Sequence, residues 1–182
     1  ARKSWRNVVV IISLLTLITL LPAPTVMAGN PKVDAFPPNS RPYGVTYGEW
    51  SAKWWQYVYE LPIEHHPLTD ATGEYCGQGQ KGPVFFLMGT TGGPITRTCA
   101  VPFGKALLIP IINGAGAVPD DGVTIKDVRR FYTSVIDQVD VGKKTLWVEI
   151  DGAALRGQAL KNFRFPSPIF SFNGAVPNVY SG

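Results

Sequence analysis

The stretch "GEWSAKWWQYVYELP" (48–62) carries three tryptophans and two tyrosines. Such a density of rings marks either a binding surface or the buried face of a helix. Thr46 precedes the stretch as a potential N-cap, and Glu49 follows it three residues later, which is the capping-box pattern. Pro62 disfavours continuation of a helix. The pattern therefore predicts a helix from Thr46 to about Glu60.

One face of this predicted helix is apolar over about 100°, the usual width for a helix that docks on a core. Its members are Tyr47, Trp50, Trp54, Tyr57, Val58 and Leu61. Trp55 and Tyr59 lie off this face, one turn apart. They either pack under a second layer or form an exposed aromatic pair that contacts a ligand.

The N-terminal segment has the three parts of a secretory signal. Three basic residues begin it, an apolar run (8–21) follows, and Val26-Met27-Ala28 supplies small residues for cleavage. We expect residues 1–28 to direct export and to be cleaved, which places the protein in the periplasm or outside the cell. The alternative is an uncleaved segment, through which alone we expect contact with a membrane.

Composition narrows the classes of function. The formal net charge is +4, but three of the basic residues lie in the signal-like segment, so range 29–182 is close to neutral. We exclude a nucleic-acid partner, because no basic cluster stands out. Cys76 and Cys99 are the only cysteines. In an exported chain they predict a disulfide, worth about 3 kcal/mol of stability.

The rest of the chain predicts short strands separated by turns. Residues 29–45 are an irregular lead-in rich in proline. Apolar or alternating runs predict strands at 83–90, 95–101, 105–113, 145–152, 163–165 and 168–172. "MGTTGGP" (88–94) is interpreted as a hairpin turn, and Asp151-Gly152 turns the chain after the strand at 145–152.

A second helix is predicted after Thr124, with an apolar stripe of Val128, Phe131, Val135 and Val139. The fold class is therefore mainly β with helices (α+β). We expect a β-sandwich or jelly-roll-like core with two packed helices, in a single domain over residues 46–182. The chain stops at "NVYSG" without a closing element, so we expect the domain to continue beyond it.

Four segments carry a family resemblance: "YGEWSAKWWQ", "HPLTDATGEYCGQGQKGPVFFLMGTTGG", "RTCAVPFGKALLIPIIN" and "LWVEIDG". In this order they resemble a family of uncharacterised exported bacterial proteins, over about residues 43–180. The resemblance implies export, a shared fold and further aromatic-rich strands beyond residue 182. It supplies no catalytic residues.

The outer face of the strand at 145–152 is the leading candidate for ligand binding. Leu146, Val148 and Ile150 point one way, and Trp147, Glu149 and Asp151 point the other. A ring beside carboxylates suits a sugar, which stacks on the ring and donates hydroxyl hydrogen bonds to the carboxylates. The alternative is that another segment covers this face.

The segment "ELPIEHHPLTDATGEYC" (60–76) is the candidate for catalysis, as acid/base groups or metal ligands. Its candidate residues are His65, His66, Asp70 and Glu74. The histidines lack the helical spacing of a zinc site. In the simpler interpretation, "DATG" is a turn in which Asp70 caps main-chain amides.

Arg97 shares its side of a predicted strand with Cys99. A buried arginine there should pair with a carboxylate, and we favour this ion pair over an anion site.

Three functions follow. The first is a non-catalytic exported domain that binds or scaffolds a glycan or envelope polymer, through Trp55, Tyr59, Trp147, Glu149 and Asp151. The second is an exported hydrolase that uses the 60–76 segment. The third is a protein–protein interaction module. We predict no cofactor and no bound metal.

Overall fold

A computed structural model describes residues 32–116, 122–139, 146–174 and 177. The chain divides into two compact units, Ala1–Asn30 and Pro31–Gly182, and every described residue belongs to the second. The predicted signal segment (1–28) therefore lies outside the described residues. Among the helices that are described, none has the length and apolar character needed to cross a membrane.

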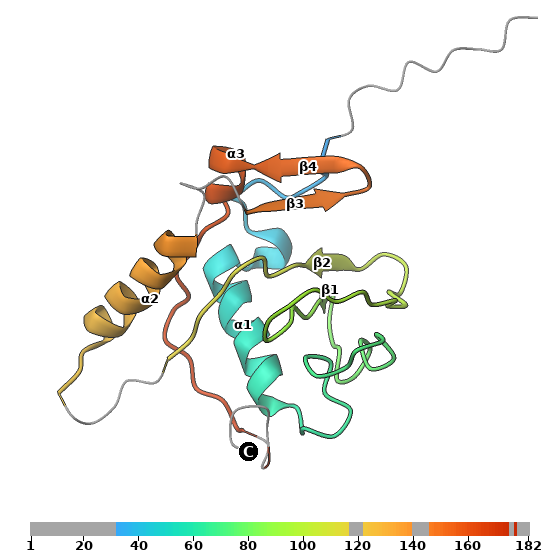
Figure 1. Ribbon diagram of the computed structural model, residues 1–182, viewed down its shortest axis with the longest axis horizontal. Coiled ribbons are helices and arrows are strands. Elements are labelled where there is room, and N and C mark those ends of the chain that lie inside the picture. Colours follow the sequence, from blue (N-terminus) through green and yellow to red (C-terminus); the bar gives the residue numbers. More distant parts are fainter. Residues whose placement is uncertain (1–31, 117–121, 140–145, 175–176, 178–182) are drawn as a thin grey trace, which may run out of the picture. The chain divides into compact units, whose positions relative to one another are not determined.

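The described chain has an α+β architecture, as predicted (Figure 1). Its elements in chain order are η1 (Pro42–Gly44), α1 (Tyr47–Glu60), β1 (Val84–Phe86), β2 (Ala106–Leu108), α2 (Ile125–Val139), β3 (Trp147–Ile150), β4 (Ala153–Arg156) and α3 (Gly157–Lys161). The strands form two separate two-stranded sheets, β1–β2 and β3–β4. The β-sandwich or jelly-roll core stays a prediction.

Helix α1 begins with the predicted capping box. The Thr46 amide donates to Glu49 Oε2 over 2.7 Å, and the Glu49 amide donates to Thr46 Oγ1 over 3.3 Å. These two bonds satisfy main-chain donors that a helix start would otherwise leave open. The helix ends at Glu60, with extended backbone at Leu61. The prediction of this helix is confirmed to within one residue.

The apolar core of the described unit is built around α1. Trp54, Trp55 and Val58 form its buried cluster, with exposed fractions of 4%, 7% and 0%. Buried positions cover roughly two-thirds of the helix circumference at 100° per residue, more than the single face predicted. The Trp54 indole donates to the Leu87 carbonyl over 3.0 Å, so this buried N–H is satisfied.

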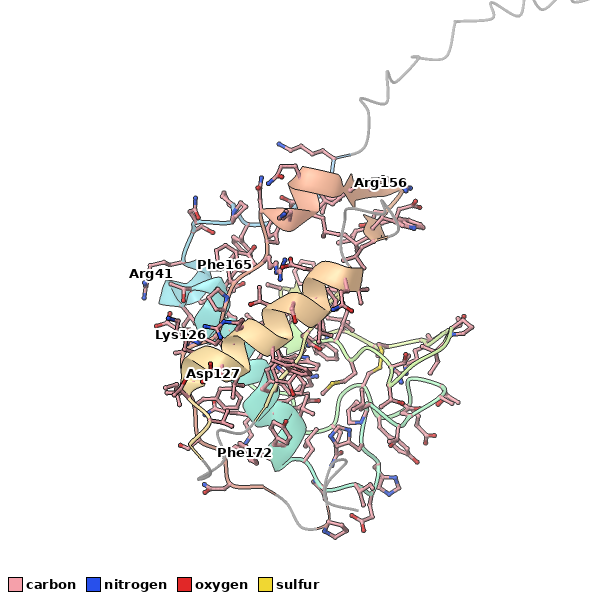
Figure 2. The ribbon with its side chains drawn as sticks, turned by 60° about the vertical axis from the view of Figure 1, so that its left-hand side comes forward. Arg41, Lys126, Asp127, Arg156, Phe165 and Phe172 are labelled. Atoms are coloured by element: carbon pink, nitrogen blue, oxygen red, sulfur yellow. A yellow bond between two sulfur atoms is a disulfide. The ribbon has the colours of Figure 1, made fainter. Side chains whose placement is uncertain are left out.

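An extended segment after α3, residues 163–173, lies along α1 in the same direction as the helix (Figures 1 and 2). Near the start of α1, Tyr47 stacks on Phe165 with ring centroids 5.4 Å apart. Near its end, Tyr59 stacks on Phe172 at 4.2 Å. Between these contacts, Gln56 donates to the Ser171 carbonyl over 2.8 Å.

The strands predicted at 163–165 and 168–172 are wrong, since neither range is a strand. Pro166 and Pro168 each lack the amide hydrogen that a strand ladder needs. The rings of this segment instead pack against a helix, where no ladder of main-chain bonds is required.

Strands β1 and β2 pair in parallel, with Val84 opposite Ala106 and Phe86 opposite Leu108. They are shorter than the predicted 83–90 and 105–113, and 95–101 is not a strand. Because 95–101 is not a strand, the bend at 91–93 joins no hairpin, and the hairpin turn predicted at 88–94 is also wrong.

Helix α2 forms where predicted, but none of its residues is buried. Phe131 is 61% exposed, and Val135 and Val139 of the same predicted stripe are also exposed. Polar contacts attach the helix to the extended segment: Arg164 pairs with Asp137 at 2.5 Å, and Arg129 donates to the Ser167 carbonyl at 3.0 Å. The prediction that α2 packs its stripe on the core is therefore wrong.

Strands β3 and β4 form an antiparallel hairpin around the predicted Asp151-Gly152 turn, and β4 is not among the predicted strands. Both turn residues have positive φ, 50° and 77°, as a two-residue type I′ turn requires. Val148 and Ile150 are half-buried, whereas Trp147 and Glu149 are exposed. The predicted alternation of this strand is confirmed.

Candidate functional site

In the polar segment after α1 (residues 60–76), the side chains of His66 and Asp70 form hydrogen bonds to main-chain groups. The side chain of His66 is 1% exposed. Its Nε2 lies 3.1 Å from the Val58 carbonyl, and its Nδ1 accepts from the Leu68 amide over 3.0 Å. These partners require a neutral ring with the proton on Nε2. Burial lowers the pKa of His66, which favours the same neutral form.

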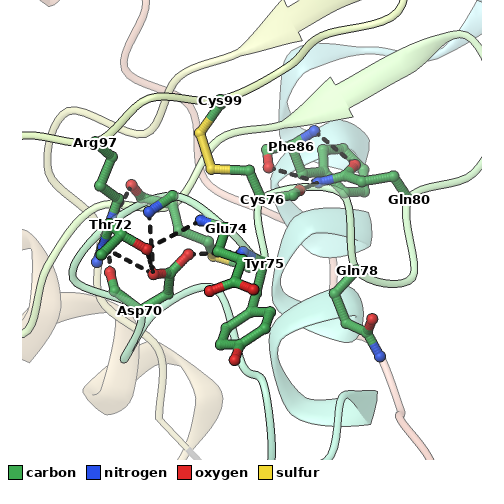
Figure 3. The surroundings of a disulfide bond; sticks show 12 residues. Asp70, Thr72, Glu74, Tyr75, Cys76, Gln78, Gln80, Phe86, Arg97 and Cys99 are labelled. Atoms are coloured by element: carbon green, nitrogen blue, oxygen red, sulfur yellow. Dashed lines mark hydrogen bonds between the residues drawn. A yellow bond between two sulfur atoms is a disulfide. The ribbon is translucent and has the colours of Figure 1, made fainter.

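Asp70 caps main-chain amides, as the turn interpretation predicts (Figure 3). Its Oδ1 accepts from the amides of Thr72 and Gly73, at 2.8 and 3.0 Å. Its Oδ2 accepts from the Tyr75 amide at 2.8 Å. Although burial acts to raise it, these hydrogen bonds lower the pKa of Asp70 to about 2.

The other two catalytic candidates lie on the surface. His65 is exposed, has a positive φ of 61°, and places its ring 4.5 Å from that of Tyr75. Glu74 is exposed as well. Within the described ranges, no group of three or more His, Cys, Asp or Glu side chains could hold a metal ion. The four candidates are therefore not assembled into one site.

The predicted Cys76–Cys99 disulfide is present and joins the polar segment to the β1–β2 crossover (Figure 3). Arg97 lies two residues before Cys99 and ties the same two regions together. Its guanidinium donates to four main-chain carbonyls, those of Leu68, Asp70, Met88 and Gly89, over 2.5–3.0 Å.

The carboxylate partner predicted for Arg97 is wrong. Across the part of the chain that the structure describes, the ion pairs within 4.0 Å are Arg41–Glu49, Arg130–Asp127 and Arg164–Asp137. Main-chain oxygens replace the carboxylate, because the 60–76 segment and the crossover each present two carbonyls to the guanidinium.

The outer face of the β3–β4 hairpin places a ring, a carboxylate and a guanidinium together. Trp147 is 46% exposed, and the Arg156 guanidinium carbon lies 4.5 Å from the centre of its ring. This cation–π contact holds the ring in place. Glu149 lies on the same face opposite Ala154, whose small side chain leaves the carboxylate accessible.

The remaining ligand candidates differ in their surroundings. Asp151 is exposed but sits in the turn, beyond the last residue of the strand. Trp55 is 7% exposed and stacks on Tyr59 at 5.6 Å, and Tyr59 is covered in turn by Phe172. The second-layer interpretation of this pair is therefore the one that the packing supports.

Sequence reasoning missed Arg156, although a signal for it exists. A two-residue turn at Asp151-Gly152 fixes the register, which places residue 156 opposite Trp147. It also missed Gln80, whose side-chain amide donates to the Phe86 carbonyl at 2.8 Å and accepts from the Phe86 amide at 3.0 Å. No local sequence pattern predicts the contact between Gln80 and Phe86.

Comparisons with protein-family models, with curated proteins and with solved structures give no match to this chain.

Proposed function

We propose that the protein is an exported, non-catalytic binding domain that contacts a glycan or envelope polymer through the outer face of the β3–β4 hairpin. The observation that carries the proposal is the open face itself, on which Trp147, Glu149 and Arg156 lie together. This proposal rests on the β3–β4 hairpin alone. That the protein has a β-sandwich or jelly-roll-like core is proposed separately.

The chemistry of the face suits a polyhydroxylated ligand. The apolar side of a sugar ring can stack on an indole, while its hydroxyls donate to a carboxylate and accept from a guanidinium. Because Arg156 already holds the indole, little side-chain entropy is lost when the ligand binds. The small Ala154 gives the sugar room beside Glu149.

One further observation supports this assignment over a hydrolase, and a second supports export. His66 and Asp70, the buried pair of the four catalytic candidates, already have main-chain partners. The Cys76–Cys99 disulfide supports export, since disulfides persist in oxidising compartments. We also propose that the chain belongs to the family of exported bacterial proteins that it resembles. Export agrees with a location in an oxidising compartment.

A protein–protein interaction module is the second candidate. It is favoured by the exposed apolar stripe of α2, to which Phe131, Val135 and Val139 belong. Large exposed apolar patches commonly mark contact sites between proteins.

The test is a screen of the purified protein against an array of bacterial envelope glycans and peptidoglycan fragments. We expect binding to at least one class and a loss of about tenfold or more in affinity for Trp147→Ala, because the stacking surface is removed. Phe103→Ala is the matched control, since Phe103 is fully exposed outside the hairpin. Absence of binding, or equal losses in both variants, would contradict the proposal.

A further inference from the structure

A cavity of about 420 Å³ lies beside the disulfide, where the β1–β2 ladder ends. Both cysteines line it, together with the apolar side chains of Leu87, Met88, Val101 and Ile109. This volume falls within the range of small-molecule sites, about 300–1,000 Å³. The cavity is separate from the β3–β4 face, since no residue of that hairpin lines it.

Arg97 is the charged residue in this lining. A guanidinium is a positively charged group that only donates hydrogen bonds. It donates four hydrogen bonds to main-chain carbonyls, one from Nε, two from Nη1 and one from Nη2. A guanidinium has five N–H groups, so the second terminal nitrogen, Nη2, has one more to donate.

Carbonyl dipoles solvate this cation without supplying a negative charge. No described residue places a carboxylate within 4.0 Å of Arg97, and no acidic residue lines the cavity. A half-buried cation with apolar walls is stabilised by an anion that brings its own apolar body. The cavity thus offers one ligand both a cationic side chain and an apolar lining.

We propose that this cavity binds an aliphatic carboxylate, a medium-chain fatty acid. The carboxylate accepts from Arg97, and the alkyl chain contacts Leu87, Met88, Val101 and Ile109. A carboxylate fits better than a phosphate group, because phosphate carries more charge and its sites gather several donors. A neutral alcohol of equal length fills the same space but leaves the guanidinium without a counter-charge.

The experiment titrates decanoate and decanol into the purified, oxidised protein and follows binding by calorimetry. We expect decanoate to bind about tenfold or more tightly than decanol, because only decanoate forms a charge-assisted hydrogen bond. Equal affinity for the two probes, or no binding of decanoate up to its solubility limit, would overturn the proposal.

A matched pair of variants locates the site. Val101 is 37% exposed at the cavity wall, so a polar residue is tolerated there. Val101→Glu places a competing carboxylate at the wall of the cavity that Arg97 also lines, and Val101→Gln is its neutral isostere. We expect decanoate affinity to fall about tenfold or more further in Val101→Glu than in Val101→Gln. Equal effects of the two substitutions would overturn the assignment of Arg97 as the anion partner.

Trp147→Ala separates this site from the glycan surface. Decanoate should bind this variant as it binds the parent chain, because Trp147 does not line the cavity. Loss of decanoate binding in Trp147→Ala would overturn the proposed location, whatever the glycan screen shows.

Discussion

At the scale of single residues, the segment after α1 shows how titratable side chains can serve the main chain. His66 and Asp70 are both buried, and each is hydrogen-bonded to main-chain groups. The turns of this segment pair some of their own amides and carbonyls, and the side chains of His66 and Asp70 supply partners for others. The polar atoms of His66 and Asp70, which suggest catalysis in the sequence, are therefore engaged in hydrogen bonds that hold the main chain.

Asp70→Asn tests this role through pH. The pKa of Asp70 is about 2 in the folded protein against an ordinary value of 3.8, so its ionised form favours folding. That contribution is fully present above 3.8 and is lost as the pH falls toward about 2. We expect Asp70→Asn to be less stable in urea at neutral pH, because an amide nitrogen cannot accept from the Tyr75 amide.

The difference in stability between Asp70→Asn and the parent chain should shrink across that acidic window. Urea denaturation at a series of pH values measures it. A difference that stays constant from neutral pH to pH 2 would show that the carboxylate charge is not involved.

At the scale of elements, α1 is stable through what surrounds it rather than through its own propensity. The extended segment 163–173 covers one side of the helix, and the β1–β2 region meets another through the Trp54 indole. Gly48 permits the close approach of the extended segment. A Cβ added there would lie 2.5 Å from the Pro166 carbonyl oxygen.

Gly48→Ala is therefore expected to destabilise the protein, against the trend for helices. Alanine is favoured over glycine within a helix by about 1 kcal/mol, so an undocked helix would gain stability. The clash with a rigid main-chain oxygen outweighs this gain. Thermal unfolding followed by circular dichroism measures the sign, with Lys53→Ala on the exposed side of α1 as the control. A higher melting temperature for Gly48→Ala would show that residues 163–173 do not pack on α1.

At the scale of the whole molecule, long-range contacts must hold small elements together. Sheets of two strands are marginally stable alone, and the described unit has two of them. The Cys76–Cys99 disulfide and Arg97 both join the polar segment to the crossover that follows β1. We infer that these two links maintain the region around the cavity.

Replacing both cysteines by serine tests the first link. Loss of the disulfide should cost about 3 kcal/mol, or about 6–12 °C in melting temperature for a chain of this size. Calorimetry under oxidising conditions measures it, and the parent chain treated with a reductant should show the same decrease. An unchanged melting temperature would mean that the disulfide does not constrain the unfolded chain.

Sequence patterns predict the features whose cause is local. The capping box gives the start of α1, the Asp151-Gly152 turn gives the hairpin register, and the alternation after it gives the outer face with Trp147. Of the two contacts of His66, the bond from the Leu68 amide is local, whereas the one to the Val58 carbonyl depends on how the chain turns back on α1. The same holds for parallel pairing of β1 with β2, which brings distant segments together.

The prediction that α2 packs its apolar stripe on the core is wrong for a related reason. Its apolar periodicity shows that the helix has one apolar face, but not what packs against that face. Phe131 belongs to the stripe and is nonetheless exposed. A pattern within one element fixes its own geometry, whereas burial depends on the neighbours that the fold supplies.

The central claim is that the ligand surface lies on the β3–β4 hairpin and not on the segment at 60–76. Backbone amide and indole NMR shifts, recorded while the tightest glycan of the array is titrated into the protein, test it most directly. We predict that the largest shifts will fall on the Trp147 indole and on amides 147–156, with the His66 and Asp70 region unchanged. Largest shifts within residues 60–76 would contradict the account.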